Sequence, residues 1–328
     1  AHFPLHDETS KIREQLELNG YAILPGIVKR EECDRFMSSA VVPAVSSLTS
    51  FREDDPSTFA DVEGVMIHDK GKDPICNEDA RWPALMESPR LKRILDDLHG
   101  GKTRWEWLHD DNVGWIHIRF PIVTKERCME QSRLPLVGDY GWHVDGGHFE
   151  FHKHNSPDQS VILLPMLRDV SDIGGATKLI KGSHIEVAQH LSYYGRCGVH
   201  RRMLNEGVKM YHVHSILNRD PSRLVTASAR KGDVLLMHPF LIHTAVVNTK
   251  GQPWRYTFNM GTRWGKEEDG RLIRDSPVGK VALGEDAHAV HYGEFVRIGF
   301  RCGGGYMKVG EDGIVKAAHV EVSGGDYL

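Results

Sequence analysis

The stretch YGWHVDGGHF, residues 140–149, places a histidine and an aspartate two positions apart. In an extended segment, side chains at i and i+2 point to the same side, so the imidazole of His143 and the carboxylate of Asp145 can converge on one point. Imidazole and carboxylate suit iron, and a third ligand from another strand would leave open positions on one face of the ion. A surface turn is the commoner explanation of so short a pattern, so further ligands must be found elsewhere in the chain.

The best third ligand is His243, in KGDVLLMHPFLIHTAVVN. It follows an apolar strand and a break at Pro239, so we expect it to begin a new strand. Its neighbour His238 is the rival, because it can equally lie beside the site or end the preceding strand. Arg255 follows in GQPWRYTF, and a guanidinium holds a carboxylate through two hydrogen bonds that lysine does not match. The order Asp145, His243, Arg255 therefore predicts a metal beside a carboxylate receptor.

Other histidines compete for the same role. His109 and Asp111 in LHDDN repeat the His-x-Asp spacing, but they follow a helix and have a turn signature behind them. His212 and His214 in YHVHS can chelate a metal as a pair, although no carboxylate is near them in the sequence. His184 in KGSH is typical of a loop or a helix start. The chain has 20 histidines, which favours metal chemistry but also multiplies chance matches.

The elements that must position these residues differ between the two parts of the chain. Before about residue 110, we predict helices over residues 7–20, 29–43 and 81–100, with the second ending at Pro43. A short strand, YAILPGIV, lies between the first two helices.

From about residue 113, short β-type runs alternate with turn signals. The runs are VGWIHIRF, GWHV, SVILLPML, ATKLI, RLVTASA, DVLLMHPF, HTAVVN and RYTFNMGTRW. They predict a mainly β fold with flanking helices, of the jelly roll or a similar closed type. Residues 121–139 and 182–222 are too long for hairpin loops and are typical of lids or binding loops.

The absence of repeats or linkers favours a single domain over residues 1–328. It would have helices over about 1–110, a β core over about 111–265 and a C-terminal extension over 266–328.

Composition and charge exclude several classes of protein. The net charge of −4 argues against nucleic acid as a partner, and no apolar run approaches the roughly 20 residues of a membrane span. The start AHFPLHDETSK is too polar for a signal peptide, and five scattered cysteines without Cys-x-x-Cys spacing fit reduced thiols in the cytoplasm. We therefore expect a cytoplasmic monomer or homodimer that acts on a small molecule.

Several ordered motifs resemble the phytanoyl-CoA dioxygenase family of iron(II)/2-oxoglutarate oxygenases. They are NGYAILPGIVKREECDRF, GWHVDGG, GGATKLIKGSH and KGDVLLMHPFLIHTAVVN with the arginine that follows, and they span about residues 10–265. The resemblance implies a double-stranded β-helix, the cupin-like jelly roll. It also implies that His143, Asp145 and His243 hold iron(II).

The same resemblance implies how the cosubstrates bind. 2-Oxoglutarate would chelate the iron and pair its distal carboxylate with Arg255, while O2 takes the remaining position. Thr257, in an Arg-x-Thr pattern, and Thr177, in GGATKLIKGSH, are further candidates for contacts with 2-oxoglutarate. The implied reaction is hydroxylation, or another oxidation, of a biosynthetic intermediate, with release of succinate and CO2. Asp145 favours this over halogenation, because related halogenases lack the carboxylate.

Other functions stay open on the sequence alone. An acyl-CoA hydroxylase of the phytanoyl-CoA type would need basic groups for phosphates, and Arg196, Arg201 and Arg202 offer them, although a solvated loop explains them more simply. A cupin-type metalloenzyme would not use 2-oxoglutarate, and its activity would survive loss of Arg255. A non-catalytic binding protein would have no need of the complete ligand set.

Overall fold

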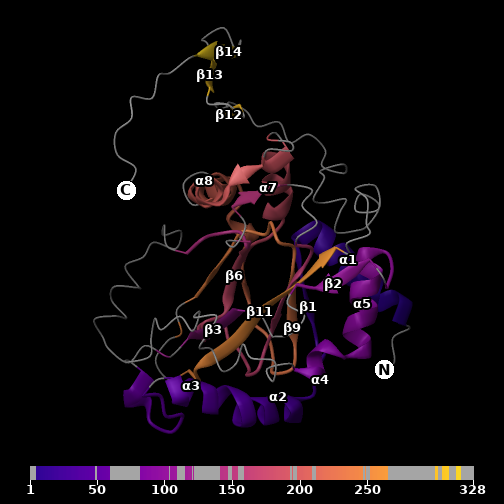
Figure 1. Ribbon diagram of the computed structural model, residues 1–328, viewed down its shortest axis with the longest axis vertical. Helices are drawn as coiled ribbons and strands as arrows, with labels where there is room; N and C mark the ends of the chain where they lie inside the picture. Colours follow the sequence, from indigo (N-terminus) through magenta and orange to yellow (C-terminus); the bar gives the residue numbers. More distant parts are fainter. Residues whose placement is uncertain are drawn as a thin grey trace.

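The structure is a computed structural model with two antiparallel sheets that face each other and helices on both outer sides (Figure 1). No helix among the described residues combines the length and the apolar character that a membrane crossing needs. The structure describes residues 5–48, 50–59, 82–102, 104–108, 115–119, 121, 141–146, 150–153, 159–192, 194, 198–208, 212–246, 248, 252–264, 300–301, 305–309 and 315–318.

The N-terminal part is mostly helical, as predicted. Gly20, at φ 79°, ends the first helix, and the Ser88 hydroxyl caps the last one by accepting from the amide of Leu91. The elements are α1 (Leu5–Asn19), β1 (Tyr21–Leu24), α2 (Arg30–Phe36), a π-helical turn (Met37–Val41), α3 (Val42–Leu48), a 3-10 turn (Pro56–Phe59), α4 (Pro83–Met86) and α5 (Pro89–His99).

The prediction that the second helix ends at Pro43 is wrong. The helix continues through α3 to Leu48, directly after the π-helical turn Met37–Val41. Proline lacks an N–H and its ring crowds the carbonyl one turn earlier, which normally stops a helix. The wider π turn relieves this crowding and leaves Pro43 in the first turn of α3, where a missing N–H costs little.

The two sheets are assembled from the predicted β-type runs. The large sheet has the order β1-β9-β5-β11-β2, with β3 also paired to β11, and the small sheet has the order β10-β6-β8. Besides β1, the large sheet contains β2 (Trp105–Trp107), β3 (Trp115–Arg119), β5 (Ile162–Pro165), β9 (Val234–Met237) and β11 (Arg255–Trp264). The small sheet contains β6 (Thr177–Ile180), β8 (Leu224–Ala227) and β10 (His243–Ala245).

Two short sheets complete the described strands. One pairs β4 (Phe151–His152) with β7 (Val199–His200), and the other contains β12 (Phe300–Arg301), β13 (Gly305–Val309) and β14 (Val315–Ala318). The described strands do not close into a barrel. The predicted mainly β fold with flanking helices is confirmed, and its facing sheets are the arrangement of a double-stranded β-helix.

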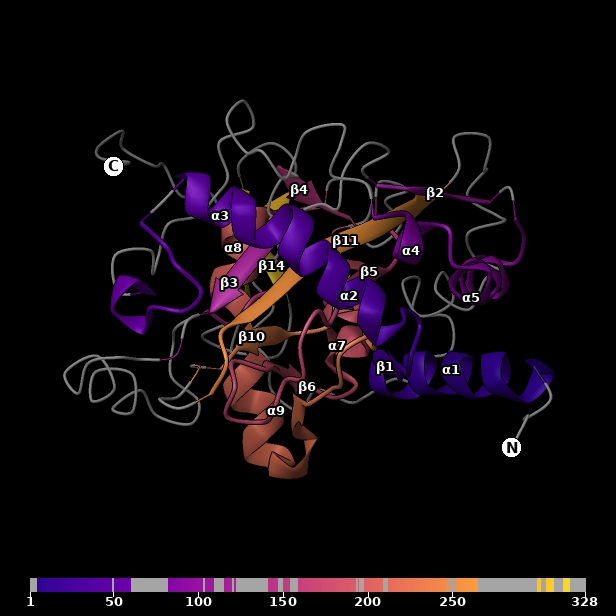
Figure 2. The same cartoon turned by 90° about the horizontal axis from the view of Figure 1, so that it is seen from below.

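Strand alternation decides which residues face the space between the sheets. On β11, Tyr256 and Phe258 are buried in the cluster that includes the N-terminal helices, so the alternate residues Arg255, Thr257 and Asn259 face the small sheet. Figures 1 and 2 show α2 and α3 lying across this outer face. The side chains of these three polar residues are therefore directed to the interior.

The insertion over residues 182–222 packs against one end of the small sheet, where Ile180 and Ile242 belong to its buried cluster. Its described part contains the short strand β7 and three helices, α7 (Ser183–Ser192), α8 (Arg201–Gly207) and α9 (Val213–Arg219), and α7 and α8 lie on the side of the sheets opposite α2 and α3 in Figure 1. Arg223 anchors α7 to the strand β8 by hydrogen bonds of 2.6 and 3.0 Å to the Glu186 carboxylate. The predicted loop is thus a packed layer, whereas residues 122–139 lie outside the described residues.

Three histidines, two of them buried and His212 half-buried, are expected to make the folded protein sensitive to acid. Burial lowers the pKa of His99, His184 and His212 from 6.5 to about 4. The unfolded chain therefore binds protons that the folded protein does not, so the stabilisation is complete above pH 6.5 and is lost as the pH falls toward 4. Each histidine should lower the free energy of unfolding by up to about 1.4 kcal/mol per pH unit in this window.

Urea denaturation at pH 7 and pH 5 measures this loss. His99→Gln should reduce the difference between the two pH values, because a neutral amide replaces the imidazole that bonds Leu95 and Ser160. Asn218→Gln, which changes one neutral amide for another at an exposed position of α9, should leave the difference unchanged. Equal stability at the two pH values would contradict the expectation.

Candidate metal centre

The side chains of His143, Asp145 and His243 meet between the sheets. One ligand atom from each lies within 4.8 Å of the other two, and this is the one such group of histidine, cysteine or acidic residues in the described part of the chain. The Nε2 atoms of His143 and His243 lie 3.9 and 3.6 Å from the two carboxylate oxygens of Asp145. Residues that are far apart in the sequence therefore form one cluster.

The main chain fixes the two histidines opposite each other. His143 and His243 form an antiparallel bridge in which each amide donates to the other's carbonyl at 3.0 Å, so their side chains point to the same side. His243 begins β10 as predicted, whereas GWHV forms this bridge and not a strand. Gly141 and Gly146 flank the segment at φ 88° and 100°, a backbone conformation that other residues rarely adopt.

Hydrogen bonds set the same tautomer in both imidazoles. Nδ1 of His143 lies 2.5 Å from the carbonyl oxygen of Gly141, and Nδ1 of His243 lies 2.9 Å from that of Leu241. A carbonyl oxygen only accepts, so Nδ1 carries the proton and Nε2 keeps its lone pair. Each Nε2 is thus ready to bind a metal, with its ring held by the backbone.

The three side chains of the cluster differ in their exposure to solvent. The side chains of His243 and Asp145 are 8% and 12% exposed, whereas that of His143 is 41% exposed, so the cluster opens to solvent beside His143. Burial, followed by the charge of a protonated His143, lowers the pKa of His243 to about 4. His243 is therefore neutral at pH 7, and the two imidazoles and one carboxylate fit a divalent transition metal.

A residue that sequence reasoning missed contacts the carboxylate. Asn259 on β11 donates from Nδ2 to Oδ1 of Asp145 at 3.1 Å. The signal was present, because Asn259 continues the alternation of Arg255 and Thr257 along the inward face of one strand. The large sheet thus fixes the carboxylate of a segment that lies far away in the sequence.

The predicted cosubstrate residues lie on the same inward faces. Arg255 is 4% exposed and donates to the carbonyl of Gly175 at 2.5 Å and to the hydroxyl of Thr177 at 3.2 Å, so two of the predicted residues touch. The Thr257 hydroxyl donates to the carbonyl of Pro165 at 2.8 Å. Arg255 lies four residues before Asn259 on β11, which corresponds to about 13 Å along the strand.

The rival histidines lie elsewhere. The ring of His238 lies against that of His184, with centroids 5.2 Å apart and planes tilted by 47°, and the His238 amide donates to the carbonyl of Gly20. The ring centroids of His212 and His190, both in the insertion, lie 5.1 Å apart. His109 and Asp111 lie outside the described residues.

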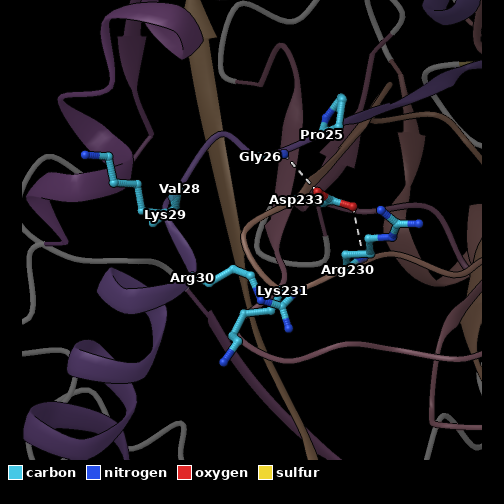
Figure 3. A pocket seen from close by; sticks show the side chains of 8 residues that line it. All are labelled: Pro25, Gly26, Val28, Lys29, Arg30, Arg230, Lys231 and Asp233. Atoms are coloured by element: carbon cyan, nitrogen blue, oxygen red, sulfur yellow. Dashed lines mark hydrogen bonds between the residues drawn. The ribbon is translucent and has the colours of Figure 1, made fainter.

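A hollow of about 570 Å³ lies next to the turn between β8 and β9, and none of the three clustered residues lines it (Figure 3). Asp233 accepts from the amides of Gly26 and Arg230 there. Lys29 and Arg230 point to opposite sides in Figure 3, and Arg30 and Lys231 are paired with Asp169 and Asp34, which do not line the hollow. The hollow is therefore not built to hold a ligand.

Comparison with known proteins gives a family match. The family model of phytanoyl-CoA dioxygenase (PhyH) matches residues 16–256 of the chain. No curated protein matches it.

Solved structures similar to the chain include the non-heme alpha ketoglutarate dependent carbocyclase SnoK from nogalamycin biosynthesis. It is 16% identical with a TM-score of 0.48, over 85% of this chain and 95% of SnoK. The epimerase SnoN in complex with Fe3+, alpha ketoglutarate and nogalamycin RO is 14% identical with a TM-score of 0.47, over 82% of this chain and 90% of SnoN. HygX from Streptomyces hygroscopicus, with nickel and 2-oxoglutarate bound, is 16% identical with a TM-score of 0.39, over 76% of this chain and 86% of HygX.

Proposed function

The chain belongs to the phytanoyl-CoA dioxygenase family of iron(II)/2-oxoglutarate-dependent oxygenases, and on this premise we propose that His143, Asp145 and His243 bind its iron. The observation that carries the proposal is that Nδ1 of both imidazoles lies within hydrogen-bond distance of a backbone carbonyl oxygen, which leaves both Nε2 atoms to face the Asp145 carboxylate. These two imidazoles and one carboxylate would hold the iron, and such a ligand set would leave coordination positions for the cosubstrate and O2.

Arg255 is proposed to bind the distal carboxylate of 2-oxoglutarate. Its burial supports this role, because a guanidinium forms strong bidentate bonds where water is excluded. Thr177 holds the guanidinium from the small sheet, and Thr257 lies next along the inward face of β11. We propose both threonines as further contacts of the cosubstrate.

Iron with 2-oxoglutarate and O2 supplies oxidation of a C–H bond, coupled to the formation of succinate and CO2. The chain contributes the positions of the reactants. The bridge between His143 and His243 fixes two ligands, Asn259 orients the carboxylate, and the buried faces of the two sheets exclude water from the inner side. The exposed side of His143 is where we propose that the substrate approaches.

The substrate is a small molecule, and we propose a biosynthetic intermediate, as in the nogalamycin enzymes named above. We further propose that residues 1–328 form one domain, as a monomer or homodimer, in the cytoplasm. The free thiol of the buried Cys33 supports the last point, because thiols stay reduced there.

Anaerobic titration with iron(II) and 2-oxoglutarate tests the proposal. The expected result is a weak visible charge-transfer band that requires both additions. Absence of the band from a folded protein would contradict it. Candidate substrates, including acyl-CoA thioesters and the corresponding free acids, can then be ranked by the succinate release that they stimulate in air.

Asn259→Ala is expected to weaken metal binding by about 10- to 100-fold, the usual effect of removing a partner of a ligating group. The carboxylate of Asp145 would lose the donor that holds one of its oxygens. Calorimetric titration with Mn(II) measures the change. Asn218→Ala, at an exposed position of α9, is the matched control, and an affinity equal to wild type in Asn259→Ala would show that the bond is dispensable.

A further inference from the structure

The helical insertion contacts both segments that carry the clustered residues. Val144, between His143 and Asp145, donates its amide N–H to the side-chain oxygen of Asn205 in α8 at 3.3 Å. Ile242, directly before His243, donates its amide N–H to the hydroxyl of Ser183 at the start of α7 at 2.9 Å. Two polar side chains of one layer therefore hold the backbone beside all three ligand positions.

Apolar packing reinforces these hydrogen bonds. Trp142 and Val144 are 3% and 1% exposed and belong to one buried cluster with Ile242 and residues of α7, α8 and α9. Because side chains alternate in an extended segment, burying Trp142 and Val144 in the insertion turns His143 and Asp145 the other way, toward the space between the sheets.

The segment that follows is tied to the insertion as well. β4 (Phe151–His152) pairs with β7 (Val199–His200), and Arg201 donates its amide to the carbonyl of Glu150 at 3.0 Å. The chain on both sides of Asp145 is thus attached to the same helical layer. Such attachment restricts the movement of the ligand segment relative to β10.

We propose that Asn205 and Ser183 are positioning residues that set the spacing of the metal ligands through the backbone of Val144 and Ile242. The insertion is then a brace of the metal centre and not a lid over it. This inference rests on the proposed function, since it requires that the three clustered residues bind the metal.

Metal affinity of the full-length protein tests the brace. Asn205→Leu keeps the size of the side chain and removes the acceptor, and Co(II) titration should show a dissociation constant raised about tenfold, with a changed visible spectrum. Asn205→Asp keeps an oxygen acceptor and should return affinity and spectrum toward wild type. Asn218→Leu, a matched change in α9 of the same insertion, should bind as wild type does.

Ser183→Ala provides an independent test, since it removes the acceptor on the other segment, and it decides the matter if Asn205→Leu does not fold. Wild-type Co(II) affinity in a folded Asn205→Leu or Ser183→Ala variant would overturn the brace. The same holds if Asn205→Asp binds as weakly as Asn205→Leu. A wild-type protein that binds no Co(II) would instead overturn the proposed function, and the inference with it.

Discussion

Replacing His243 with alanine is expected to reduce 2-oxoglutarate turnover to background, a loss well beyond the roughly 100-fold cost of removing an outer partner of a ligand. The variant keeps only His143 and Asp145, which lie two residues apart on one segment, and it loses the proposed ligand on the small sheet. Succinate formation measures turnover, and Co(II) titration measures the accompanying loss of binding. His143→Ala and Asp145→Ala should behave alike.

Two other histidines provide the controls for this experiment. His214→Ala changes an exposed residue of α9 that belongs to the rival His212 pair, and it should keep wild-type turnover. His238→Ala removes the rival from the same stretch of sequence, and it should keep metal binding because His238 lies against His184. Turnover in folded His243→Ala, or its loss only in His238→Ala, would remove His243 from the proposed ligands.

Arg255→Ala is expected to raise KM for 2-oxoglutarate by about 100-fold, because loss of charge-assisted hydrogen bonds to a carboxylate costs up to about 3 kcal/mol. Arg255→Lys should fall between wild type and alanine, since an ammonium supplies the charge without the paired geometry. Initial rates over a range of 2-oxoglutarate concentrations measure the change.

A 2-oxo acid that lacks the distal carboxylate separates this role from general damage. The KM for this analogue should be the same in wild type and Arg255→Ala, because the analogue has no distal carboxylate for the guanidinium to bind. If KM for 2-oxoglutarate is unchanged in Arg255→Ala, a metalloenzyme that does not use 2-oxoglutarate becomes the better explanation. Arg255→Lys tests the point in a variant that keeps a buried cation beside Gly175 and Thr177.

Much of the fold follows from local sequence patterns. DVLLMHPF and SVILLPML contain β9 and β5, and RYTFNMGTRW is the whole of β11, because apolar or alternating runs between turn signals have few other folded forms. The insertion was harder, since its length alone indicated a loop, whereas α7–α9 pack with Trp142 and Val144 in one buried cluster. The extension of the second helix past Pro43 depends on a π turn that has no residue signature.

Some residues of the site could likewise be predicted from the sequence, and others could not. Imidazole, carboxylate and guanidinium are rare enough in buried strands for their spacing to point to chemistry. Asn259 and Asn205 are ordinary amides, and their roles arise from contacts with residues 114 and 61 positions away. Only the pairing of the sheets and the docking of the insertion bring these residues to Asp145 and Val144.

The bridge between His143 and His243 has a consequence for folding. If β10 slipped by one residue, Ile242 or Thr244 would take the inward position and the imidazole would turn away from Asp145. A divalent ion would then meet two of the three proposed ligands. Because an ion that binds only one state stabilises that state, metal binding would favour chains with the native strand register. A chelator would lower the stability of these chains and leave the stability of slipped chains unchanged.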